Sequence, residues 1–265
     1  MPHHAHTAGT SPWDALLVLA LLAAAAGYAL ALWRNRHRSP WPVHRTVLWY
    51  AGLACAAAAT SGPLAAAAAT SFTAHMAGHV LLGMLAPLLL VLAAPVALVL
   101  RALPVAQARS FGRVLGGTPV RVLAHPVIAL VLDAGGLWLL YGTDLFHLAH
   151  RSSAVGFAVH AHVLLAGCLL TAALVAPPPR HHLASLRVRV VVLGVFVAVH
   201  SALAKWLYAH PPTGVAPQDG RTGAQLMYYA GDVVDVALMV LLVAGWYSAT
   251  RPRPVVPERS RVVPT

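Results

Sequence analysis

Charged side chains are scarce in this sequence. Only 9% of its 265 residues are Asp, Glu, Lys or Arg, against about a quarter in an average soluble domain. The mean hydropathy is correspondingly high, at +0.71. A soluble fold with so little charge would be hard to keep in solution, so the composition predicts an integral membrane protein.

Cysteine is scarce as well. The two cysteines, Cys55 and Cys168, both fall within apolar runs and form neither a C-x-x-C pair nor a disulfide framework. We expect them to pack as small buried hydrophobic side chains, with a thiolate ligand for copper as the alternative.

No lysine or arginine precedes the first apolar run. A cleaved signal peptide needs positive charge before its apolar core, so we expect a retained first helix with its N-terminus outside. The predicted division is an extracytoplasmic histidine-containing tail at residues 1–12, a membrane domain at residues 13–248 and a basic cytoplasmic tail at residues 249–265.

Seven apolar segments each approach or exceed the ~20 residues that a helix needs to cross hydrocarbon. They lie near residues 13–33, 45–65, 72–100, 123–143, 153–176, 186–208 and 224–248. The third contains Pro87 and Pro95, so we expect a kink or an early stop near its inner end. The predicted fold class is an all-α bundle of seven transmembrane helices.

The basic residues are distributed asymmetrically. Fifteen of the 18 lie between spans one and two, three and four, or five and six, or in the C-terminal tail. Arg151 and Arg221 lie on the opposite side, with Lys205 near it. The positive-inside rule then predicts an outer N-terminus and a cytoplasmic C-terminus. It also accounts for the net charge of +11 without nucleic acid as a partner.

Three side chains that can bind metal stand at the start of the third segment. His75 and His79 are four residues apart and project about 40° from each other on a helix, with Met76 on the flank of the same face. Imidazole and thioether suit copper better than they suit lipid. A structural role, bonded to neighbouring helices or reaching the interface, is about equally compatible with these residues.

Most other polar residues within the spans share the predicted outer half of the membrane. The further candidate ligands are His160, His162 and His200, and the candidate pocket residues are Asp232, Asp235, Lys205, Asp219 and Met227. Ionisable groups in lipid are costly and normally face the bundle interior or a wet cavity. We therefore predict an outward-facing pocket walled by spans three, five, six and seven.

Each of these residues also has a structural interpretation. His160 and His162 are about 200° apart on a helix, so they cannot both face one site. Asp232 and Asp235 are expected to pair with Lys205 or a histidine rather than to bind metal. Such a carboxylate can still orient an imidazole. The methionines Met84, Met227 and Met239 are expected to pack rather than to bind metal.

Four stretches of the sequence form a recognisable combination. They are HMAGHVLLGMLAPLLLVLAAPVALVLRALP, the pair His125-Pro126, HAHVLLAG from His160, and VHSALAKWLY around His200. The combination resembles the CtaG family of cytochrome c oxidase assembly factors over roughly residues 13 to 248.

The last span resembles the same family in part. Asp219 and the pair Gly231-Asp232 match its pattern, whereas Gly220 stands where Gln is usual and Tyr228 where Trp is usual. If that Gln has a role at the pocket mouth, the role is in question for this chain.

The resemblance implies a protein of the bacterial cytoplasmic membrane that helps to mature a haem–copper oxidase by supporting copper insertion. The implied partners are oxidase subunits and an extracytoplasmic copper carrier, and the cargo is copper, as Cu(I) rather than Cu(II). Delivery makes and breaks no bond in a substrate, so an enzyme is not expected. Domains related to this family also occur beside copper-resistance membrane domains, so the resemblance leaves copper import or copper tolerance open as functions.

Two further functions remain open. A b-type haem redox protein needs axial histidines on facing helices at matched depth, which His79 and His160 would supply. A proton or ion transporter would use Asp232, Asp235, Lys205 and the histidines. Transport should leave polar groups in the inner half too, where only Asp133, near mid-membrane, is a candidate.

Overall fold

The fold is entirely helical in the part of the chain described by the computed structural model, which comprises residues 12–38, 40–175 and 184–250. The predicted all-α class is therefore confirmed. The first half contains α1 (Pro12–Asn35), α2 (Val43–Thr60), α3 (Gly62–Ala68), α4 (Phe72–His79), the π-helix η1 (Val80–Leu85), α5 (Ala86–Leu92) and α6 (Pro95–Ala102). The second half contains α7 (Val105–Leu115), α8 (Thr118–Leu123), α9 (Pro126–Gly142), α10 (Leu145–Arg151), α11 (Ser153–Val175), α12 (Leu186–Ala209) and α13 (Pro217–Thr250).

Six helical stretches are long and apolar enough to cross a bilayer. They are Ala15–Asn35, Val43–Ala68, Phe72–Ala102, Ser153–Val175, Leu186–Ala209 and Pro217–Thr250. A seventh span exists if α9 and α10 are counted together, although the chain bends by 80° between them. The 17 residues of α9 cover only roughly 25 Å of a hydrocarbon layer about 30 Å thick. The apolar helices indicate a multi-pass membrane protein. The outer N-terminus and the cytoplasmic C-terminus remain predictions.

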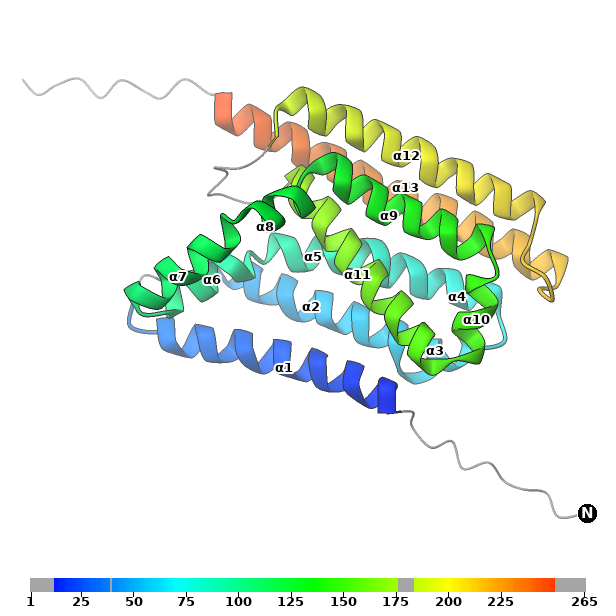
Figure 1. Cartoon of the computed structure of the whole chain (residues 1–265), viewed down its shortest axis with the longest axis horizontal. Coiled ribbons are helices and arrows are strands. Elements are labelled where there is room, and N and C mark those ends of the chain that lie inside the picture. The colour runs from blue at the N-terminus through cyan, green and yellow to red at the C-terminus, as the bar shows by residue number, and fades with distance from the viewer. Residues whose placement is uncertain (1–11, 39, 176–183, 251–265) are drawn as a thin grey trace, which may run out of the picture.

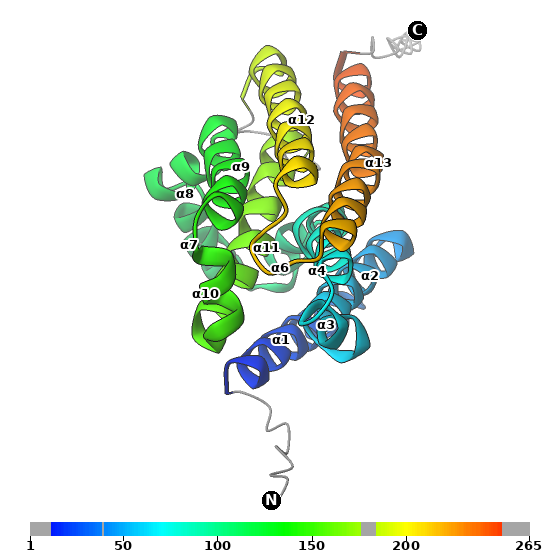
Figure 2. The same cartoon turned by 90° about the vertical axis from the view of Figure 1, so that its right-hand side faces the viewer.

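Different short helices form the two ends of the bundle. The short helices α3, α4 and α10 lie at one end, and α6, α7 and α8 lie at the other (Figure 1). The helices α12 and α13 pack side by side in opposite directions, while α1 lies at the edge farthest from α12 (Figure 2). The end that contains α3, α4 and α10 is the one predicted to face outwards.

The third span is irregular at two places. Pro87 has no backbone N–H, so the carbonyl of Gly83 loses its usual α-helical donor. The preceding residues form η1 instead, in which the N–H of Ala86 bonds the carbonyl of Leu81. The second break is at Ala94, which adopts a left-handed φ of 52° directly before Pro95. The expected kink is thus present, and the first irregularity begins directly after His79.

Helix α11 packs closely against this irregular segment. A Cβ atom at Gly167 would lie 2.4 Å from the carbonyl oxygen of Gly83 and 2.8 Å from Cγ of Pro87. No real side chain fits at that distance, so the contact between α11 and the break in span three depends on glycine.

Four apolar clusters pack the described part of the bundle, and two of them are large. One, towards the predicted cytoplasmic end, is centred on Leu88, Leu174 and Leu193. The other, towards the predicted outer end, contains Phe72 and Leu203. Buried polar side chains lie between the two clusters, and these form the functional candidate described below.

The first test concerns the close approach of α11. We expect Gly167→Ala to destabilise the protein by about 1–3 kcal/mol, because the added methyl group overpacks a backbone contact. The measurement is the apparent midpoint of thermal unfolding in detergent. Gly194→Ala is the matched control, since nothing lies within 4 Å of the added Cβ there. Equal midpoints for the two variants would contradict the proposed contact.

Candidate functional site: a histidine-lined cavity at the mouth of span three

The helix that carries the first candidate ligands is held at its start by a residue far away in sequence. The carboxylate of Asp219, on α13, accepts hydrogen bonds from the backbone N–H of Phe72 at 2.6 Å and of Thr73 at 3.1 Å. It also accepts one from the Thr73 hydroxyl at 2.6 Å. A carboxylate here satisfies free N–H groups and complements the positive end of the helix. Asp219 therefore positions α4.

One glycine, Gly223, lets α13 approach α4 closely enough for this contact, and a second, Gly220, packs against the loop that precedes α13. A Cβ atom at Gly223 would lie 2.7 Å from Cδ1 of Phe72, and one at Gly220 would lie 2.6 Å from Cβ of Pro211. The contact with Pro211 gives a physical reason why this chain has glycine at position 220, where Gln is usual. A glutamine at that position would have to displace Pro211.

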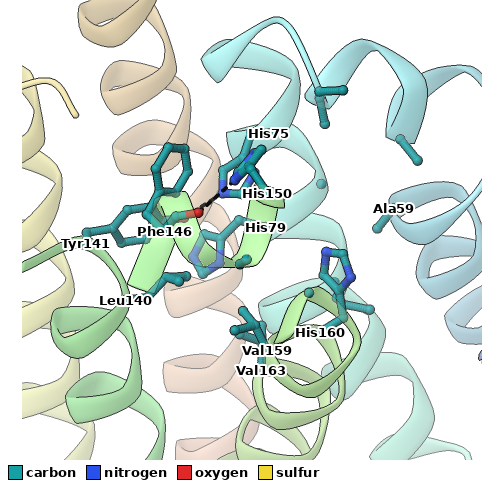
Figure 3. A pocket seen from close by; sticks show the side chains of 17 residues that line it. Ala59, His75, His79, Leu140, Tyr141, Phe146, His150, Val159, His160 and Val163 are labelled. Carbon is teal, nitrogen blue, oxygen red and sulfur yellow. Dashed lines mark hydrogen bonds between the residues drawn. The ribbon is translucent and has the colours of Figure 1, made fainter. Parts of the chain in front are cut away.

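An open cavity of about 200 Å³ lies beside α4. Four histidines from α4, α10 and α11 line it, together with aliphatic and aromatic side chains (Figure 3). These histidines are His75, His79, His150 and His160. Three of them are candidate ligands predicted from the sequence, and the fourth, His150, was expected on an outer loop at the rim of the pocket.

His150 reaches the cavity because it belongs to a short helix. Phe146 and His150 are four residues apart on α10 and lie on one face, and their rings are 4.5 Å apart at the centroids. The four-residue spacing was visible in the sequence. The 80° bend that brings α10 over the cavity was not.

His75 belongs to a chain of polar contacts at the cavity wall. Its Nε2 atom lies 3.0 Å from the hydroxyl of Tyr141, and that hydroxyl lies 3.9 Å from the sulfur of Met76. The ring centroids of His75 and His150 are 5.4 Å apart. These two imidazoles are therefore neighbours across the cavity.

Met76 does not line this cavity. It is fully buried in the outer apolar cluster, as is Met227. One residue along an α-helix turns the side chain by about 100°, which carries Met76 away from His75 and towards α13. The structure thus separates Met76 from the histidines that flank it, and Met227 packs in the core.

His79 stands between the open cavity and a second, smaller space. Its ring centroid is 6.1 Å from that of His200 on α12, and the two rings are nearly parallel. The Nε2 atoms of both histidines are buried and lack hydrogen-bond partners. Apolar residues line half of the smaller space, and the rest of its lining is His79, Met84, Asp133, His162 and His200.

His160 and His162 point to different places. His160 lines the open cavity, while Nε2 of His162 lies 3.0 Å from the carbonyl oxygen of Leu132 on α9. Gly136 makes this possible, because a Cβ atom there would be 2.4 Å from that nitrogen. His162 thus joins α11 to α9 and also borders the smaller space.

The expected pairing of the aspartates with Lys205 or a histidine is wrong for Asp235. That carboxylate is 1% exposed, and neither oxygen has a hydrogen-bond partner. Lys205 lies about 140° around α12 from His200 and places its ammonium over the ring of Tyr228, at 5.5 Å. Asp232 is half-buried one turn before Asp235.

The histidines do not form a closed metal cage. Among the described residues, no group of three or more His, Cys, Asp or Glu side chains is arranged to hold a metal ion. The arrangement offers pairs of imidazoles instead, with His75 near His150 and His79 near His200.

These features define a class: multi-pass helical membrane proteins with a histidine-lined cavity at one end of the bundle. The sequence pattern of the cytochrome c oxidase caa3 assembly factors (Caa3_CtaG) matches residues 26–249, and this chain belongs to that family.

Three mycobacterial proteins, all described as uncharacterized, are similar to this chain. Those of Mycobacterium bovis and Mycobacterium tuberculosis are each 33% identical over 161 residues, which is 56% of this chain and 24% of theirs. That of Mycobacterium leprae is 27% identical over 262 residues, which is 88% of this chain and 39% of its own. The chain therefore spans well under half the length of these relatives. No solved structure matches it.

The capping role of Asp219 yields the second test. Asp219→Ala should destabilise the protein by about 1–2 kcal/mol, because the first turn of α4 loses its acceptor. The matched control is Asp144→Ala, which also removes a carboxylate before a helix but one whose side chain makes no capping bond. Thermal unfolding of both variants in detergent measures the difference. A loss of stability as large in the control would refute the capping role.

Proposed function

We propose that this chain hands copper, as Cu(I), to an immature cytochrome c oxidase through the histidine-lined cavity. The observation that carries the proposal is the convergence of His75, His79, His150 and His160, from three helices, on one open cavity. Family membership supplies the oxidase as the recipient. An extracytoplasmic carrier would supply the metal, in a bacterial cytoplasmic membrane.

The ligand chemistry suits transfer. Imidazole is a borderline donor that binds copper well, and Cu(I) is satisfied by few ligands. His75 and His150 present two rings 5.4 Å apart at the cavity wall, and among the described residues no third His, Cys, Asp or Glu completes a metal site with them. An incompletely surrounded ion keeps a position open, which a ligand of the carrier or of the oxidase can occupy during exchange. No bond of a substrate is broken, so the proposed activity is not enzymatic.

The size of the cavity favours an ion over haem. Pockets for drug-sized ligands occupy about 300–1,000 Å³, and this cavity offers about 200 Å³. A porphyrin held between His79 and His160 would need the surrounding helices to move apart.

The apolar packing on the predicted cytoplasmic side of the histidines argues against ion transport. The inner apolar cluster, which includes Leu88, Leu174 and Leu238, fills the bundle on the predicted cytoplasmic side. Ions would have to cross close-packed aliphatic side chains there, at a high desolvation cost. The arrangement supports loading and release from the same outer side.

The third test measures the copper content of the oxidase in cells that lack this chain and are complemented with variants. We expect the double substitution His75→Ala/His150→Ala to lower oxidase-bound copper several-fold, because the outer pair of imidazoles is lost. The amount of the variant protein in the membrane must equal that of the parent.

The control for this experiment is His210→Ala. His210 lies beyond α12, outside the cavity, where its ring bonds the carbonyl of Trp206. It should leave the copper content of the oxidase unchanged. Full copper loading in cells that carry the double variant would refute delivery through the cavity.

A further inference from the structure

Three buried polar side chains in the bundle have atoms without a hydrogen-bond partner. The Nε2 atoms of His79 and His200 and both carboxylate oxygens of Asp235 have no hydrogen bond. His200 is 2% exposed and Asp235 is 1% exposed. Buried polar groups are nearly always bonded, so a cluster of exceptions calls for an explanation, such as an ion held among them.

The backbone leaves room around both imidazoles. A Cβ atom at Gly231 would lie 2.7 Å from Cε1 of His200, and one at Gly83 would lie 3.3 Å from Cε1 of His79. Any larger residue at Gly231 would push against the ring of His200. The two glycines therefore form a cradle for this pair of histidines, on α13 and on η1.

A soft sulfur ligand lies in the same cradle. The Cβ position at Gly231 that is 2.7 Å from His200 is also 3.5 Å from Sδ of Met84. Met84 lines the small enclosed space together with both histidines. The π-helical turn of η1 carries Met84, and such turns are frequent at functional sites.

Buried carboxyl groups lie next to this space. Asp133 is part of its wall, and Asp235 follows Gly231 by one helical turn, on the same face of α13. A cation moved into a low-dielectric interior loses its hydration, and a nearby carboxylate offsets part of that loss. The surroundings of the two histidines are thus suited to a positive charge.

We propose that His79, His200 and Met84 form an inner Cu(I) site, deeper than the open cavity. The inference rests on the proposed function and adds a place where the cargo is held. His79 lines both spaces, so it is the ligand shared by the outer and inner positions. Copper moves between them by ligand exchange and stays Cu(I), so no electron donor or acceptor is required.

The sulfur donor makes the inner site distinguishable from the outer one. We would purify the full chain carrying His75→Ala/His150→Ala, load it anaerobically with Cu(I), and measure bound copper against a Cu(I) chelator. X-ray absorption at the copper edge reports the donor atoms. We expect about one copper per chain with both sulfur and nitrogen neighbours.

Two additional substitutions in that background identify the ligands. Met84→Leu should remove the sulfur neighbour and weaken Cu(I) affinity at least tenfold while preserving the volume of the side chain. His200→Gln should also weaken it at least tenfold, and it keeps a polar side chain in case His200→Ala does not fold. Met239→Leu is the control, because Met239 is 39% exposed and should change neither measurement.

The outcomes separate the two proposals. Two results would overturn the inner site and leave the outer cavity intact. One is a sulfur neighbour of copper that persists in Met84→Leu. The other is a double variant that holds no copper while the parent holds copper on nitrogen alone. Oxidase copper that is unaffected by the double variant would overturn delivery through the outer cavity while leaving the inner site in place. A parent chain that binds no Cu(I) would overturn both.

Discussion

The contact between the carboxylate of Asp219 and the first N–H groups of α4 determines the geometry of the whole site. It fixes the start of α4 against α13, with Gly223 providing the space. Every candidate ligand on span three is placed relative to that point. His75 lies within the first turn, and His79 ends α4. The same contact joins α4 to the helix that supplies Gly231 and Asp235, so the outer and inner parts of the site share one anchor.

The distribution of polarity along the bundle follows from the cost of burying charge. Histidines surround an open cavity at one end, two aspartates lie near the middle, and aliphatic side chains fill the other end. Under the proposed function, such an arrangement would admit a cation from one side and give it no path to the other. This one-sidedness, together with family membership, is the physical basis for the proposed role in supplying an oxidase from the outer face of the membrane.

Much of the fold was predictable from the sequence, because the lengths of the apolar runs fix the long helices. Predictions based on helical periodicity also separated His160 from His162. Contacts distant in sequence were not predictable. The capping bonds of Asp219 join residues 147 positions apart, and the bend before α10 that brings in His150 leaves no periodic signal. Asp235 lacks the partner expected for it because proximity along the membrane normal says nothing about the helix face, and the ammonium of Lys205 lies over Tyr228.

The π-helical turn in span three has a consequence for the register of the chain. A π-turn is equivalent to one extra residue in an α-helix, and one residue corresponds to a rotation of about 100°. If Val80–Leu85 wound as an ordinary α-helix with the same number of residues, His79 would turn by that angle relative to Leu88. Span three would then present its outer histidines and its inner apolar face in directions that no longer match α11 and α12. The winding of this short segment, as much as the identity of its residues, sets how the two halves of the span face their neighbours.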